Sequence, residues 1–110
     1  MNIQIFGTRK CQDTRKAERY FKERRIKYQF IDLTVKGMSK GELSSVKNAV
    51  KLENLIDTTG KEYQKRNLKY IVHDVEEVLL NNPQLLKTPI VRNGPKATVG
   101  YSPEIWQEWD

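Results

Sequence analysis

The beginning of the chain is a strand, a helix and a second strand in direct succession. Residues 3–6 form a short β-rich run, and residues 28–33 alternate apolar and polar side chains. Between them, Ala17, Tyr20 and Phe21 recur at helical spacing within a strongly charged segment. Because a helix of this length separates the two strands, we expect them to pair in parallel through a right-handed crossover.

The end of the chain predicts two further strands and a helix. Residues 87–92 regain strand character, Asn93-Gly94 is a hairpin signal that Pro95 lengthens, and residues 97–99 supply the partner strand. Ser102-Pro103-Glu104 then opens a final helix. Its expected apolar anchors are Ile105, Trp106 and Trp109.

The middle of the chain reads as helical. Ser39 and Glu42 form a capping box before a helix that carries Leu43, Val46 and Val50. Residues 61–68 and 74–80 predict two more helices, and His73 is expected to cap one of them or to face solvent. We therefore predict one α/β domain, residues 1–110, with a mixed sheet in the order β-α-β … β-β-α. Its core is residues 1–36 and 87–110, and its helical insert is residues 37–86.

Composition excludes several classes of protein. The net charge is +6, but basic and acidic residues are interleaved, so direct binding of nucleic acid is not expected. No apolar run is long enough to span a membrane, and residues 1–6 are too short and polar for a signal peptide. A single cysteine excludes an internal disulfide, and the only histidine is far from it, so we expect no metal and no bound cofactor. These features predict a cytoplasmic protein.

Cys11 is the candidate functional residue. It follows the first strand and starts the first helix, which places it at the carboxyl end of a sheet strand, where open α/β sheets carry their sites. The free N–H groups of a helix start favour a thiolate, and Arg9, Lys10, Arg15 and Lys16 are expected to surround it with cations. The alternative is a buried, inert cysteine.

The residues after Cys11 limit its chemistry. A dithiol oxidoreductase needs a second cysteine three positions on, where this chain has Thr14. Thr14 can donate a hydrogen bond to the thiolate, but it cannot resolve a mixed disulfide, so turnover needs an outside thiol. Arg15, about one turn away, is expected to hold an oxyanion or a carboxylate, unless it is an ordinary surface arginine.

Pro89 is the second candidate position. In this layout it begins the strand that faces the Cys11 loop. The Thr88–Pro89 bond is a candidate cis peptide bond because of this layout, although only about 5% of X–Pro bonds are cis. Thr88, Pro89 and Lys87 are therefore the candidate substrate-binding residues.

Three segments together resemble the arsenate reductase (ArsC)/Spx family. The residues Cys11-Gln12-Asp13-Thr14-Arg15-Lys16-Ala17 are similar to its Cys-x-x-x-Arg-Lys-Ala signature. Residues 85–91 resemble its second landmark, a leucine pair followed by basic residues, proline and an apolar run, and residues 99–102 resemble the segment after the hairpin. The resemblance covers the whole chain and implies a thioredoxin/glutaredoxin-like fold with Cys11 as the redox cysteine.

The resemblance implies two kinds of function. One is a monothiol, glutaredoxin-like or glutathione/glutaredoxin-dependent reductase. The arginines that cradle arsenate in the family are missing here, with Thr88, Asp57 or Thr59, and Gly100-Tyr101 in their places, so efficient arsenate reduction is not expected.

The other kind is an Spx-like regulator that binds the RNA polymerase α subunit. Thr14 removes the Cys-x-x-Cys switch of that branch, while binding without the switch stays open. The expected partners are accordingly glutathione, glutaredoxin or a protein thiol, and in the second case the polymerase subunit. A family member with an inert Cys11 is the third possibility.

Overall fold

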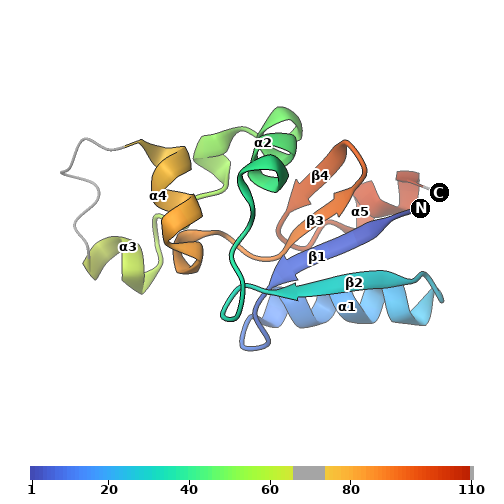
Figure 1. Cartoon of the computed structure of the whole chain (residues 1–110). Helices are drawn as coiled ribbons and strands as arrows, with labels where there is room; N and C mark the ends of the chain where they lie inside the picture. Colours follow the sequence, from blue (N-terminus) through green and yellow to red (C-terminus); the bar gives the residue numbers. More distant parts are fainter. Residues whose placement is uncertain (66–73, 110) are drawn as a thin grey trace.

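A mixed four-stranded sheet in the order β2-β1-β3-β4 forms the centre of the fold in the computed structural model, which describes residues 1–65 and 74–109 (Figure 1). β1 (Ile3–Gly7) pairs in parallel with β2 (Tyr28–Asp32), as the helical connection requires. On its other side β1 pairs antiparallel with β3 (Ile90–Asn93), and β4 (Lys96–Val99) completes the hairpin. The predicted mixed sheet, with its elements in the chain order β-α-β … β-β-α, is confirmed.

One face of the sheet is covered by α1 (Gln12–Glu23) and α5 (Pro103–Trp106), with a short helix, η4 (Gln107–Trp109), after them (Figure 1). The apolar stripe of α1 lies against side chains that β1 and β3 direct to this face. The buried members of this core are Ile3, Ile5, Ala17, Tyr20, Phe21, Val91 and Trp106. The helical spacing in the sequence therefore predicted the correct face of α1.

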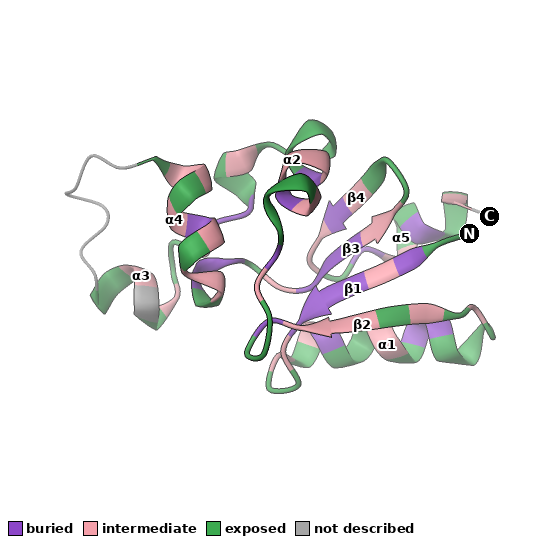
Figure 2. Ribbon diagram, viewed as in Figure 1, coloured by how far each residue is buried: buried purple, intermediate pink, exposed green. Residues whose placement is uncertain are grey.

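The other face packs against the helices between β2 and β3. They are α2 (Lys40–Ala49), η1 (Leu52–Asn54), α3 (Lys61–Lys65), α4 (Val75–Asn81) and η3 (Pro83–Leu85). Phe6, Leu43, Val46 and Leu79 belong to the second buried core, which lies between these helices and the sheet. Figure 2 shows the buried residues of α2 and α4.

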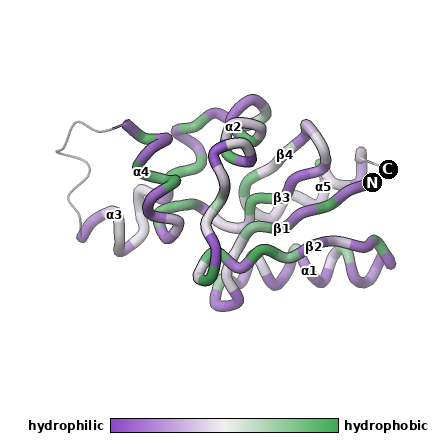
Figure 3. The backbone as a smooth tube through the Cα atoms, viewed as in Figure 1, coloured by the Kyte–Doolittle hydropathy of each residue, from purple (hydrophilic) through white to green (hydrophobic). Residues whose placement is uncertain are grey.

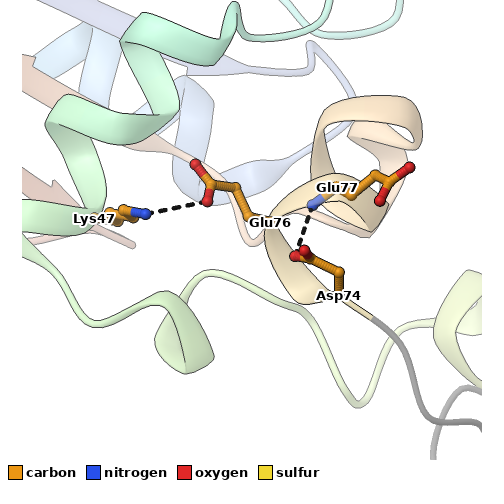
Figure 4. Close-up of polar contacts among 4 residues, drawn as sticks. All are labelled: Lys47, Asp74, Glu76 and Glu77. Atoms are coloured by element: carbon orange, nitrogen blue, oxygen red, sulfur yellow. Dashed lines mark hydrogen bonds and ion pairs between the residues drawn. The ribbon is translucent and has the colours of Figure 1, made fainter.

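Side-chain caps define where two of these helices begin. Ser39 and Glu42 form the predicted capping box at the start of α2, with the Ser39 hydroxyl accepting from the Glu42 N–H at 3.1 Å. Asp74 caps α4, and an ion pair of 3.0 Å between Lys47 and Glu76 links α2 to α4 (Figure 4). The half-exposed pair stabilises the fold by about 1 kcal/mol at most.

Backbone hydrogen bonds tie the segment before β3 to the helical region. The Asp57 N–H donates to the Leu85 carbonyl, and the Lys87 N–H donates to the Leu55 carbonyl, both at 2.8 Å. These bonds fix the path of the chain immediately before Pro89.

Two sequence predictions differ from the structure, and two fall on residues that it does not describe. β3 begins at Ile90 and not at residue 87, because the Lys87 N–H bonds to Leu55 and Pro89 has no N–H to donate. Ile105 was expected to be an apolar anchor, but its side chain is 41% exposed because Trp106 points into the core. His73 and residues 66–68 of the predicted helix 61–68 lie outside the described residues.

The hydropathy of the helices fits their positions at the surface. Figure 3 shows α1 as mainly hydrophilic, with short less polar stretches between the hydrophilic ones. No helix within residues 1–65 and 74–109 is long and apolar enough to cross a membrane.

Candidate functional site

Cys11 lies where β1 passes into α1. Its backbone is extended, with φ −76° and ψ 119°, and it is the N-cap residue of α1. The Cys11 N–H donates to the Thr8 carbonyl at 3.1 Å, and the Cys11 carbonyl accepts from the Arg15 N–H at 3.2 Å. The half-buried sulfur therefore sits at the N-terminus of a helix, where unpaired N–H groups favour negative charge.

The cysteine contacts the segment that leads into β3. Its Sγ–H donates to the carbonyl oxygen of Thr88 at 3.6 Å, although 77 positions separate the two residues. The next residue, Pro89, is buried, and the Thr88–Pro89 peptide bond, a candidate cis bond in the sequence, is cis. This contact confirms the prediction that the segment around Pro89 faces the Cys11 loop.

Thr14 is fully buried beneath the cysteine. Among the described side chains its Oγ1 is the one buried polar atom without a hydrogen-bond partner of ordinary geometry. The Thr14 side chain occupies space above Gly7, where a Cβ atom would lie only 2.5 Å from that oxygen. Gly7 therefore lets the helix start pack directly on the end of β1.

Hydrogen bonds govern the acidity of Cys11. Burial raises the pKa of the Cys11 thiol, but the Thr14 and Thr88 side chains and the backbone N–H groups of Thr14 and Asp13 outweigh this effect. The net result is a pKa below the ordinary value for a thiol. Although the Thr14 hydroxyl does not form a well-aligned bond to the neutral sulfur, it is close enough to stabilise the charged form.

None of the four cations that were expected around the sulfur is among the causes of the lowered Cys11 pKa, and two of them have other partners. The Arg9 guanidinium lies 4.6 Å from the centre of the Phe30 ring and 3.9 Å from the Glu18 carboxylate. The Lys16 ammonium lies 5.8 Å from the centre of the Tyr101 ring. Aromatic faces thus draw these side chains elsewhere, and hydrogen bonds rather than cations lower the pKa of Cys11.

The other residues predicted for the site differ in how far they are buried. Arg15 and Lys87 are exposed, Thr88 is half-buried, and Pro89 is buried. The chain places Thr88 and Thr14 beside Cys11, while no contact joins Arg15 or Lys87 to the sulfur among the described residues.

Gly7 is the residue that the sequence analysis did not single out. It ends β1, and its role depends on a side chain seven positions later. The only signal in the sequence was a glycine at the junction of a strand and a loop, where glycine is common whether or not a side chain packs against it.

The residues near Pro89 offer little to hold an oxyanion or a metal. Thr88 precedes the proline, and the Asp57 carboxylate accepts from the Thr59 N–H and hydroxyl at 3.3 and 2.9 Å. No group of three or more potential metal ligands occurs among the residues that the structure describes.

Known proteins resemble this chain both in sequence and in fold. The model of the ArsC family matches residues 6–109. The uncharacterised protein YusI of Bacillus subtilis is 27% identical over 98% of each chain, and the global transcriptional regulator Spx of Staphylococcus aureus is 25% identical over 91% of this chain and 80% of its own. The structure of an arsenate reductase from Vibrio cholerae superimposes with a TM-score of 0.84 at 21% identity, covering 98% of this chain and 97% of the other. The chain therefore belongs to the ArsC family.

Proposed function

We propose that this chain is a monothiol thiol–disulfide exchange protein in which Cys11 is the nucleophile. The observation that carries the proposal is the position of the sulfur, half-buried at the N-terminus of α1 and bonded to Thr88 O, with a lowered pKa. A thiolate is the reactive form of cysteine, so this environment favours attack on a disulfide.

The proposed reaction has two exchange steps. The Cys11 thiolate attacks one sulfur of a substrate disulfide, forms a mixed disulfide with it and releases the other sulfur as a thiolate. An outside thiol, for which we propose glutathione or a glutaredoxin, then attacks the mixed disulfide. With a glutathionylated substrate, the first step frees the substrate thiolate and leaves glutathione on Cys11, and the second step restores the Cys11 thiolate and releases oxidised glutathione. The outside thiol is thereby oxidised to the disulfide, while the substrate sulfur is reduced to the thiol.

Thr14 gives the site its monothiol character. It occupies the N3 position of α1, one turn from the N-cap, where a second cysteine would be able to close a disulfide with Cys11. The Thr14 hydroxyl cannot resolve a mixed disulfide, but its O–H can donate a hydrogen bond to the thiolate. We propose that Thr14 stabilises the attacking and the leaving form of Cys11.

Thr88 and Pro89 form the proposed substrate contact. When Cys11 ionises, its sulfur no longer donates a hydrogen to the Thr88 carbonyl, so that oxygen can accept an N–H from a bound peptide or glutathione. Arg15 and Lys87, both exposed, are the proposed partners of a substrate carboxylate.

We propose that arsenate is not an efficient substrate. A tetrahedral dianion needs several preorganised donors, and Thr88 stands before the proline where an arginine would serve that purpose. Asp57 places a carboxylate, already bonded to Thr59, in the helical region. The likeness to the Vibrio cholerae reductase, at 21% identity, supports a shared fold only.

Reduction of a glutathione mixed disulfide tests the proposal. A glutathionylated peptide is incubated with glutathione and the protein, and oxidised glutathione is measured with coupled glutathione reductase. We expect catalysis by the wild type, none by Cys11→Ser, and a raised KM for Arg15→Gln. Equal rates with wild type and Cys11→Ser would refute a role for the sulfur. In a parallel assay with glutaredoxin, we expect arsenite formation to stay at the background rate.

The second candidate is binding to the RNA polymerase α subunit. Its support is the similarity to proteins named Spx from Staphylococcus aureus and Oceanobacillus iheyensis, at 25% and 27% identity. Because Thr14 leaves no cysteine pair, we expect such binding to be independent of oxidation. Purified α subunit should bind wild type and Cys11→Ser equally, and absence of binding by both would eliminate this candidate.

A further inference from the structure

A groove of about 390 Å³ lies along the side of α1 that faces the start of α5, about one and a half to three and a half turns beyond Cys11. One wall consists of five residues on one side of α1. They are three or four positions apart along the helix, or adjacent, and therefore lie on the same face. They are Lys16, Arg19, Tyr20, Glu23 and Arg24. Tyr101 and Pro103 form the opposite wall, and we call this feature the α1–α5 groove.

Aromatic rings hold two of the cations of the α1–α5 groove in place. The Arg24 guanidinium carbon lies 3.7 Å from the centre of the Tyr20 ring, and its Nη1 donates to the Tyr20 carbonyl at 3.3 Å. The Lys16 ammonium lies over the Tyr101 ring at 5.8 Å. Side chains positioned in this way lose less conformational entropy when they bind a ligand.

The charge of the α1–α5 groove favours an anionic ligand. Lys16, Arg19 and Arg24 outnumber the single carboxylate, that of Glu23. Two large apolar side chains, Tyr101 and Ile105, are 42% and 41% exposed in the wall and on the adjoining helix α5. An acidic segment that also carries apolar side chains would complement both features.

The two walls of the α1–α5 groove start at the proposed redox site. One wall is α1, the helix that Cys11 begins. The other follows Gly100, whose N–H donates to the Pro89 carbonyl at 2.8 Å, and Gly100 adopts a φ of +85° that turns the chain into Tyr101. A peptide whose sulfur reaches Cys11 can therefore continue into this groove.

We propose that the α1–α5 groove binds an acidic segment of a protein partner that presents its disulfide to Cys11. This inference rests on the proposed function and adds to it the class of substrate. A protein segment fits better than a nucleic acid, because the groove is short and Glu23 would repel a phosphate backbone, which needs a longer series of cations.

A cysteine-free peptide separates this proposal from the redox chemistry. The probe is a short fluorescent peptide of alternating glutamate and leucine, with glutamine replacing glutamate in the comparison peptide, and binding is followed by fluorescence anisotropy. Arg19→Glu reverses a charge within the groove. Lys22→Glu is the matched control, since it makes the same change on the same helix at an exposed position outside the groove.

We expect the acidic peptide to bind the wild type, and Arg19→Glu to weaken binding by about fivefold or more, with little change for Lys22→Glu. The proposal would be overturned if the acidic peptide did not bind the wild type, or if both variants lost binding equally. It would also be overturned if a single-stranded DNA oligonucleotide bound more tightly than the peptide and Arg19→Glu abolished that binding. Because the peptide has no cysteine, an inert Cys11 would not alter these results, and a failure to bind would leave the reactivity of Cys11 untouched.

Discussion

A Cβ atom on Gly7 would lie 2.5 Å from Oγ1 and 2.6 Å from Cγ2 of Thr14. These distances are shorter than any non-bonded contact that the fold can accept, so the last residue of β1 has to be glycine for Thr14 to be buried there. The strand and the helix that meet at Cys11 are thus fitted to each other by these two residues.

The first prediction concerns the packing of the Thr14 side chain against Gly7. Gly7→Ala should lower the free energy of unfolding by about 1–3 kcal/mol, because the added methyl group displaces Thr14 and the start of α1. Gly41→Ala is the control, since a Cβ at Gly41 meets nothing within 4 Å and the residue lies inside α2. We expect it to stabilise the protein by about 0.5–1 kcal/mol in urea unfolding. Equal stability of Gly7→Ala and wild type would contradict the packing described here.

The second prediction separates two buried threonines. Thr14→Val removes a hydroxyl that has no partner of ordinary geometry among the described residues, so we expect the free energy of unfolding at neutral pH to stay the same or rise. The same change should raise the pKa of Cys11, because the thiolate loses a hydrogen-bond donor.

The matched control for Thr14→Val is Thr98→Val. The Thr98 hydroxyl accepts a hydrogen bond of 2.8 Å from the buried Trp106 indole N–H. Removing this hydroxyl should lower the free energy of unfolding by about 1–3 kcal/mol, since the indole N–H then has no acceptor. A large loss of stability in Thr14→Val, or no rise in the pKa of Cys11, would show that the Thr14 hydroxyl does not serve the sulfur.

The sequence predicted the elements of the fold well because their signals are local. The Ser39–Glu42 capping box and the spacing of Ala17, Tyr20 and Phe21 each depend on a few neighbouring residues. The parallel pairing of the first two strands then followed from the helical connection between them. The position of Cys11 at the start of α1 was predicted for the same reason.

The details of the site could not be predicted because they depend on distant residues. The Thr88 carbonyl reaches the Cys11 sulfur only through the pairing of β1 with β3. Arg9 and Lys16 were expected to surround the sulfur from their proximity in sequence, but the rings of Phe30 and Tyr101 attract them. Sequence proximity does not indicate which competing partner a long side chain will choose.

The third prediction follows from the lowered pKa of Cys11. The unfolded chain retains the thiol proton up to the ordinary pKa of about 8.5, whereas the folded protein releases it at lower pH. The stability that Cys11 contributes should therefore rise as the pH increases from the folded pKa to the unfolded pKa, and be lost as the pH falls. Urea unfolding of wild type and Cys11→Ser across this range measures the difference, and a difference that shrinks with rising pH would have the wrong sign.

The fourth prediction tests the monothiol character directly. Thr14→Cys places a second thiol at N3, one turn from the N-cap cysteine, which is close enough for a disulfide. We expect mild oxidation to close a bond between positions 11 and 14 in this variant, detected by mass spectrometry and loss of alkylation. Wild type should form only mixed or intermolecular disulfides. Two free thiols after oxidation of Thr14→Cys would mean that the side chains at positions 11 and 14 do not face each other.

Alkylation of native Cys11 by iodoacetamide as a function of pH decides whether the sulfur at the start of α1 is a stabilised thiolate. We expect the rate to reach half its maximum at a lower pH than for free glutathione measured alongside, and the Thr14→Val midpoint to move up toward the glutathione value. A midpoint at or above that of glutathione, or a native cysteine that reacts only after unfolding, would contradict a nucleophilic Cys11.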